Sequence, residues 1–152
     1  MIYISHRGNL FGRNIDTENT WKQIQKCLEL NYHVEIDVWY IDGEFYLGHD
    51  RPMQPINLNL LINEKLWCHA KNYDALVEMK KNENIHCFWH EKDKYTLTSK
   101  GIVWAYPGEK INSQTVCVLP ELCQYSNIEL QKCYGICSDN IAEYVRSLDI
   151  FL

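Results

Sequence analysis

Residues 34–50 read VEIDVWYIDGEFYLGHD, and this stretch decides the fold. The residues from Val34 to Ile41 are mostly β-branched or aromatic, a composition typical of a strand. Asp42-Gly43 is a dipeptide that favours a tight hairpin turn, and Phe45-Tyr46-Leu47 predicts the strand that returns from it. The stretch therefore predicts a strand and a hairpin that end together at Gly48-His49-Asp50.

Strands and helices alternate along the rest of the chain. Thr20 and Gln23 form a capping box that starts a helix reaching about Leu30. Apolar residues at helical spacing predict further helices over 73–81 and 141–148, and residues 51–64, rich in Pro and Asn, stay unassigned. Short apolar runs predict strands at residues 2–6, 66–71, 85–90, 102–106, 115–119 and 134–137.

This alternation predicts an α/β fold with a mainly parallel sheet and helices outside it. About seven strand segments and the hairpin favour a barrel over a doubly wound sheet. Eight equal units would have only about 19 residues each, whereas a typical barrel of this kind has about 250 residues in all. The prediction is a compact, trimmed TIM-type (β/α) barrel with reduced outer helices, formed as a single domain by residues 1–152.

Composition narrows the class of protein. The chain has 152 residues, 46% of them hydrophobic and 23% charged, which is ordinary for a soluble globular protein. Its net charge of −5 argues against a nucleic-acid partner, and no apolar run approaches the length of a membrane span. Seven cysteines without a Cys-x-x-Cys pair are typical of buried thiols in a reducing compartment, so we expect a cytoplasmic location. The oligomeric state stays open.

Two acidic residues on the central strand are candidate metal ligands. Glu35 and Asp37 are two residues apart, so both point to the same face. Two carboxylates about 5 Å apart repel by about 3 kcal/mol at an effective dielectric constant near 20, and a cation between them would remove this repulsion. A hard divalent ion, Mg²⁺ or Ca²⁺, suits oxygen ligands. The alternative is that one carboxylate is solvated at a rim or forms an ion pair with Arg7 or Lys71.

Two histidines and two basic residues stand at other predicted strand ends. His6 and His49 could face each other, one taking a proton from an attacking hydroxyl and the other giving one to a leaving alkoxide. Arg7 and Lys71 would supply positive charge for phosphate oxygens. These residue types together predict a site for a phosphodiester.

Four motifs in this order resemble the glycerophosphodiester phosphodiesterase family, within the superfamily of phosphatidylinositol-specific phospholipase C. They are His6-Arg7-Gly8, Glu18-Asn19-Thr20, Glu35-x-Asp37 and Gly48-His49-Asp50. Near the other end, residues 135–140 (GICSDN) are similar to the family's final strand.

The resemblance implies a shortened family member that hydrolyses phosphodiesters with the help of a metal ion. It implies that His6 and His49 form the acid–base pair, that Glu35 and Asp37 bind the metal and that Arg7 contacts phosphate. Three residues would support the site, namely Glu18, Asn19 and Asp50. Glu18 has a second interpretation, as an acidic residue favourable to the dipole of the following helix.

Of three departures from the family pattern, one falls on a candidate metal ligand. The family has Glu two residues before the lysine of the next strand, and here that position is His69, before Lys71. Imidazole is a softer ligand and shifts preference towards Mn²⁺ or Zn²⁺. Glu91 and Glu121 are alternative candidates for the third metal ligand. We therefore expect a divalent metal, Mg²⁺ or Ca²⁺ first, with Mn²⁺ or Zn²⁺ as the alternative that His69 favours.

Two functions follow as hypotheses. The first is a metal-dependent phosphodiesterase that acts on a small or lipid-derived glycerophosphodiester-type substrate. The second is a catalytically degenerate barrel that binds a phosphorylated ligand or a protein partner. The absent carboxylate at position 69 supports the second function. Six retained residues support the first, namely His6, Arg7, Glu35, Asp37, His49 and Lys71.

Overall fold

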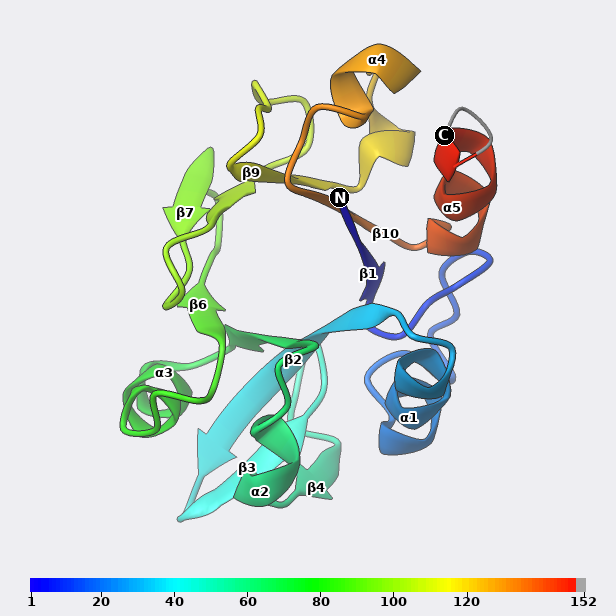
Figure 1. Ribbon diagram of the computed structural model, residues 1–152. Helices are drawn as coiled ribbons and strands as arrows, with labels where there is room; N and C mark the ends of the chain where they lie inside the picture. The colour runs from blue at the N-terminus through cyan, green and yellow to red at the C-terminus, as the bar shows by residue number, and fades with distance from the viewer. Residues whose placement is uncertain (150–152) are drawn as a thin grey trace.

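Ten β-strands form one sheet that curls round on itself (Figure 1). The computed structural model describes residues 1–149, so the last three residues of the predicted domain, 150–152, lie outside the described part. The strands are β1 (Ile2–His6), β2 (His33–Ile41), β3 (Glu44–Leu47), β4 (Gln54–Ile56), β5 (Leu66–Ala70), β6 (Cys87–Trp89), β7 (Tyr95–Leu97), β8 (Val103–Ala105), β9 (Thr115–Val118) and β10 (Gly135–Ser138).

Strand β1 lies between β2 and β10 and is parallel to both. From β2 the sheet continues to β5 and β6, and from β10 to β9, β8 and β7. Strand β3 pairs with β2 from Val38 to Ile41, at the C-terminal end of β2, and β4 pairs with β3. Six of the nine strand pairs are parallel and three, β2–β3, β3–β4 and β7–β8, are antiparallel.

Short helices cover part of the outer side of the sheet. They are α1 (Trp21–Glu29), α2 (Leu58–Leu61), α3 (Tyr73–Lys80), α4 (Asn127–Leu130) and α5 (Ile141–Asp149), with a 3₁₀ turn at Pro120–Leu122. The side chain of Thr20 accepts from the backbone N–H of Gln23 and caps α1, and Asn72 caps α3 in the same way. Because α1 and α3 contact β2 and α5 contacts β1, the helices support the middle of the sheet.

The expected trimmed (β/α) barrel is wrong. The structure is an open, curled mixed sheet with antiparallel pairs, and within residues 1–149 no ladder joins β6 to β7. Two short turns, at Asp42-Gly43 and around Gly101, reverse the chain, and a turn of this length leaves no room for the helix that a parallel crossover needs. No α-helix stands between β6 and β9 either, so this half of the sheet lacks helical cover.

The side chains pack in two clusters. The larger cluster lies between the sheet and the helices and includes Val34, Ile36 and Val38 of β2 with Ile24 of α1 and Met79 of α3. The smaller cluster lies on the concave side and consists of Ile4, Trp67, Phe88, Trp104, Val116, Val118 and Cys137. All seven cysteines are free and six are buried, as the sequence predicted for structural thiols.

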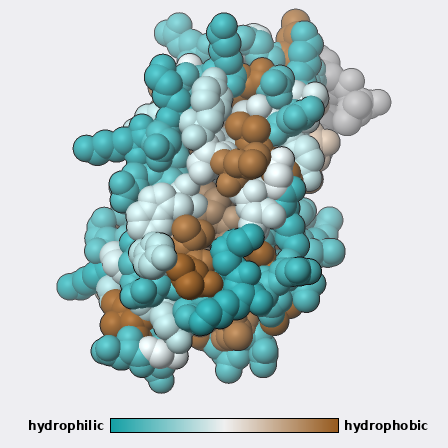
Figure 2. Space-filling model, turned by 90° about the vertical axis from the view of Figure 1, so that its left-hand side faces the viewer, coloured by the Kyte–Doolittle hydropathy of each residue, from teal (hydrophilic) through white to brown (hydrophobic). Residues whose placement is uncertain are grey.

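The strands and three longer helices that the sequence predicted lie where they were expected, within two residues at most ends. Four short elements, β4, β7, α2 and α4, were not predicted. None of the helices within residues 1–149 is long and apolar enough to span a membrane. Figure 2, which shows the side that carries β7 and α3, has small separate hydrophobic patches among hydrophilic residues.

Candidate metal and phosphate site

Strand β2 carries the two acidic residues of the site. Glu35 and Asp37 are buried, with exposed fractions of 2% and 0%, and they share the face of β2 opposite Val34, Ile36 and Val38. The register of the sheet pairs His6 of β1 with Glu35 and His69 of β5 with Asp37. Three neighbouring strands therefore bring two carboxylates and two imidazoles together.

Asp37 is the centre of the site. Its Oδ2 lies 3.1 Å from Nδ1 of His49 and 3.1 Å from Nε of Arg7, and its Oδ1 lies 3.0 Å from Nδ1 of His69 and 3.6 Å from Nζ of Lys71. Burial alone would raise the pKa of this carboxyl. The contacts with His49 and His69 and the charge of Arg7 override burial and hold the pKa of Asp37 well below its usual value.

Asn19 holds Asp37 in place. Its side-chain amide donates to Oδ2 of Asp37 at 2.8 Å, and its side-chain oxygen accepts from the backbone N–H of Asp37 at 2.9 Å. Asn19 is 4% exposed and has a φ of +56°, in the left-handed region that Asn adopts more readily than most residues. The Glu18-Asn19-Thr20 motif therefore supplies a clamp for the central carboxylate.

His69 faces both carboxylates. Its Nε2 is 2.7 Å from the carbonyl oxygen of His90, so Nε2 carries the proton and donates it. Its Nδ1 then points at Asp37 Oδ1 (3.0 Å) and Glu35 Oε1 (3.7 Å), while its ring stacks on Phe88 with centroids 5.2 Å apart. Burial lowers the pKa of His69, but its contacts with Asp37 and Glu35 raise it to about 9.

Glu35, Asp37 and His69 fit a divalent cation. One ligand atom from each of the three residues lies within 4.8 Å of the others, which suits a single ion with bonds of about 2.1 to 2.4 Å. Oδ1 of Asp37 is buried without a well-directed hydrogen bond from any described residue. The tautomer that His90 selects leaves a lone pair on Nδ1 of neutral His69, aimed at the same point.

His6 is oriented by Asp139, the residue that directly follows β10. Its Nδ1 is 2.8 Å from Oδ1 of Asp139, and its Nε2 is 3.8 Å from Oε2 of Glu35. Burial lowers the pKa of His6, but the hydrogen bond with Asp139 and the charge of Glu35 leave it raised overall. Asn9 also donates to Asp139 at 2.8 Å, which fixes this carboxylate.

His49 has a defined tautomer. Its Nδ1 donates to Asp37 at 3.1 Å, and its Nε2 accepts from the guanidinium of Arg7 at 3.2 Å. Gly48 makes the turn before it possible, because its φ is +147° and a Cβ there would lie 2.1 Å from the carbonyl oxygen of Arg51. Only glycine allows this close approach without moving His49.

Arg7 contacts several residues of the site. Besides Asp37 and His49 it reaches Glu18, with Nη1 3.4 Å from Oε1, and its backbone N–H donates to Glu35. Lys71 lies 3.6 Å from Asp37. The structure thus brings together nine of the predicted residues, namely His6, Arg7, Glu18, Asn19, Glu35, Asp37, His49, His69 and Lys71.

Three predicted residues have other surroundings. Asp50 is exposed at the rim, 3.7 Å from Nε2 of His49. Glu91 is exposed after β6, outside the three-residue cluster. Glu121 accepts from the hydroxyl of Ser138 and the backbone N–H of Asp139, so it braces the turn that presents Asp139 to His6. Of the three candidates for the third ligand, the geometry brings His69 to the cluster.

Sequence reasoning missed the role of Asp139 and Asn9. Asp139 stood in the GICSDN motif that was quoted only for its strand, and its partner His6 is 133 residues earlier. The parallel pairing of β1 with β10 joins them. A cavity of about 470 Å³ adjoins the site and is lined by residues that include Glu18, Asn19 and His49.

Comparisons with known proteins return nothing for this chain: no family model, no curated protein and no solved structure matches it. The site is therefore interpreted from its own geometry.

Proposed function

We propose that this protein is a metal-dependent phosphodiesterase acting on a small or lipid-derived glycerophosphodiester-type substrate. One observation supports the proposal above the others. Two histidines, each oriented by its own carboxylate, flank a Glu35–Asp37–His69 cluster that fits a divalent ion. Hydrolysis of a phosphodiester needs one group to accept a proton, another to donate one, and positive charge for the phosphoryl oxygens.

The two histidines suit opposite roles. Nε2 of His49 accepts from the guanidinium of Arg7 in the structure, so His49 would accept the proton of the attacking hydroxyl, from water or from the substrate, once Arg7 has turned to the phosphate. His6 has a raised pKa and would donate its proton to the oxygen that leaves phosphorus. Asp139 would stabilise the charged form of His6, as an orienting carboxylate does in other acid–base pairs.

Glu35, Asp37 and His69 would hold the divalent ion, which supplies Lewis-acid stabilisation of phosphoryl oxygens when bound. Arg7 and Lys71 would add fixed positive charge on the same side. To hold the ion through Nδ1, His69 would release its Nδ1 proton to solvent, while its other proton stays on Nε2 and is donated to the carbonyl oxygen of His90.

A specific observation also favours the second candidate, a protein that binds a phosphorylated ligand without turnover. Protonated His69, with its pKa of about 9, lies where its single positive charge offsets part of the negative charge of Glu35 and Asp37 without any metal. A site kept in that form would retain Arg7 and Lys71 for phosphate binding but would lack the ion that catalysis requires.

Activity measurements separate the two candidates. The purified protein is assayed on a chromogenic phosphodiester and on glycerophosphodiesters with Mg²⁺, Ca²⁺, Mn²⁺ or Zn²⁺ and with chelator. We expect metal-dependent hydrolysis that falls by about 10² or more in His6→Ala and in His49→Ala. His33→Gln, at the opposite end of β2, is the matched control and should keep its activity. No hydrolysis with any of the four metals, or hydrolysis unaffected by both alanine variants, would overturn the proposal.

A further inference from the structure

Glu18 is a carboxylate shared by two arginines. Its side chain is 8% exposed, and its oxygens accept from Nη1 of Arg7 at 3.4 Å and from Nε and Nη2 of Arg13 at 3.2 Å each. Asn9 also donates to it, at 3.4 Å. Burial raises the pKa of Glu18, but the hydrogen bonds from Arg13 and the charge of Arg7 lower it overall. Arg13 therefore makes the shorter contact with this carboxylate, and the contact is bidentate.

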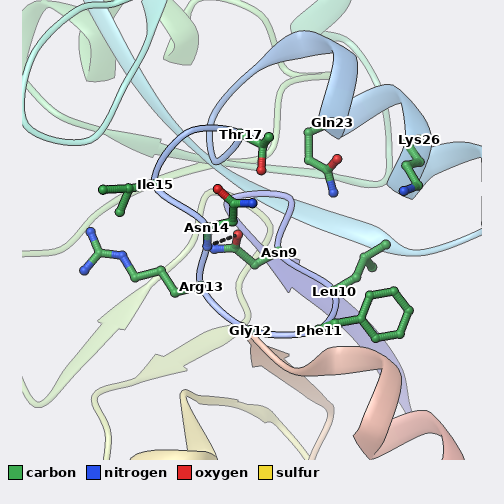
Figure 3. Close-up of a pocket in the computed structure, with 10 residues that line it drawn as sticks. All are labelled: Asn9, Leu10, Phe11, Gly12, Arg13, Asn14, Ile15, Thr17, Gln23 and Lys26. Carbon is green, nitrogen blue, oxygen red and sulfur yellow. Dashed lines mark hydrogen bonds between the residues drawn. The ribbon is translucent and has the colours of Figure 1, made fainter.

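The loop between β1 and α1 holds Arg13 in this place. Glu18 donates its backbone N–H to the carbonyl of Asn14, and the side-chain oxygen of Asn9 accepts from the backbone N–H of Asn14, which is the bond drawn in Figure 3. Figure 3 also shows Arg13 extending away from Lys26 of α1. Arg13 and Glu18, five residues apart, therefore belong to one anchored loop.

Arg7 has to leave its present contacts before it can bind phosphate. Its guanidinium lies 3.1 Å from Oδ2 of Asp37, 3.2 Å from Nε2 of His49 and 3.4 Å from Oε1 of Glu18. Two of these contacts are weak, because Nε makes no well-directed hydrogen bond to any residue within 1–149 and 3.4 Å is long for a hydrogen bond. When Arg7 turns away, Asp37 keeps His49 and Lys71 as partners.

Glu18 depends on Arg13 when Arg7 turns away. Among residues 1–149, Arg7 and Arg13 are the two cationic side chains within ion-pair distance of Glu18. Without Arg13, the side-chain donor left to this mostly buried carboxylate would be Asn9, which carries no charge. Glu18 would then hold Arg7 back, because a buried charge without its partner is costly.

We propose that Arg13 is a positioning residue that releases Arg7 to the phosphate by balancing the charge of Glu18. The inference rests on the proposed function for one point, that Arg7 contacts phosphate. It applies to hydrolysis and to binding without turnover alike.

Binding of inorganic phosphate tests the inference without turnover. The full chain is titrated with phosphate in a calorimeter in the presence of Mg²⁺. We expect Arg13→Gln to weaken binding at least about fivefold, because Glu18 then retains Arg7. In the Glu18→Gln background the same change should alter the affinity by less than about twofold. The double variant Arg13→Gln/Glu18→Gln has the net charge of the parent, so its recovered binding separates release of Arg7 from long-range attraction.

Lys26→Gln is the matched control for charge. It removes one exposed positive charge from α1, on the other side of the same loop, and should leave the phosphate affinity within about twofold of the parent. An unchanged affinity in Arg13→Gln, or an equal loss in the Glu18→Gln background, overturns the inference and leaves the proposed hydrolysis standing. A parent that binds no phosphate overturns the role of Arg7 and this inference with it.

Hydrolysis kinetics separate the inference from the proposed function. On a phosphodiester that the parent hydrolyses, Arg13→Gln should raise KM and change kcat by less than about twofold, since Arg7 is in place once substrate is bound. A fall in kcat with KM unchanged would contradict release of Arg7 as the role of Arg13. A parent that binds phosphate and hydrolyses no substrate overturns the phosphodiesterase alone, and the effect of Arg13→Gln on phosphate binding then decides the inference.

Discussion

Replacing Asn19 with alanine tests whether the central carboxylate is positioned by this residue. The change removes a hydrogen bond to the charged side chain of Asp37, typically about 1.5 to 3 kcal/mol, and leaves the buried N–H of Asp37 unpaired, typically about 1 to 3 kcal/mol. Alanine at a φ of +56° adds about 1 kcal/mol of strain. We expect Asn19→Ala to lower the free energy of unfolding by about 4 kcal/mol.

Asn19→Gly is the matched control, because it loses the same hydrogen bonds without the strain at positive φ. Glycine instead makes the unfolded chain more flexible, by about 0.4 to 1 kcal/mol. The glycine variant should therefore be slightly more stable than the alanine variant, and both far less stable than the parent. Urea unfolding followed by tryptophan fluorescence measures all three. An alanine variant within about 1 kcal/mol of the parent would refute the clamp.

Three further predictions concern the metal, the turn before His49 and a buried histidine. His69→Glu should raise the affinity for Mg²⁺ or Ca²⁺ relative to Mn²⁺ by about tenfold, measured by calorimetric titration, and an unchanged ratio would contradict His69 as a ligand. Gly48→Ala places a Cβ 2.1 Å from Arg51 and should reduce phosphodiester hydrolysis at least about tenfold, whereas Gly101→Ala, with no atom within 4 Å of its Cβ, should keep it. Burial lowers the pKa of His86 from 6.5 to about 4, so between these values the unfolded chain takes up a proton that the folded chain does not, and stability falls as the pH falls. Between pH 8 and pH 5 the free energy of unfolding should fall by about 2 kcal/mol less in His86→Phe than in the parent, measured by urea unfolding at both pH values. An equal fall in the two proteins would contradict the lowered pKa of His86.

Most of the site could be predicted from sequence because its residues follow strand periodicity. Glu35 and Asp37 alternate with Val34, Ile36 and Val38, which places the acidic pair on one face whatever the topology. Parallel pairing of the strands then places His6 beside Glu35 and His69 beside Asp37. The contact between His6 and Asp139 needed the pairing of the first strand with the last, which no local pattern records.

The trimmed (β/α) barrel was predicted wrongly because local patterns do not record how the two halves of a sheet join. Strand β7 is short and edge-like, with Tyr95 and Leu97 exposed, so it lacks the apolar run that marked the other strands. Its antiparallel return to β8 was therefore not foreseen. Pro55 and the asparagines around it obscured β4 and α2 in the same way, because these residues disfavour regular structure in isolation.

The position of a bound ion tests the central claim most directly. Crystals of the protein are soaked in Mn²⁺, and its anomalous scattering locates the metal. We expect one ion bound by carboxylate oxygens of Glu35 and Asp37 and by Nδ1 of His69, with His6 and His49 on either side of it. An absent peak at millimolar Mn²⁺, with His69 still in contact with both carboxylates, would contradict the account.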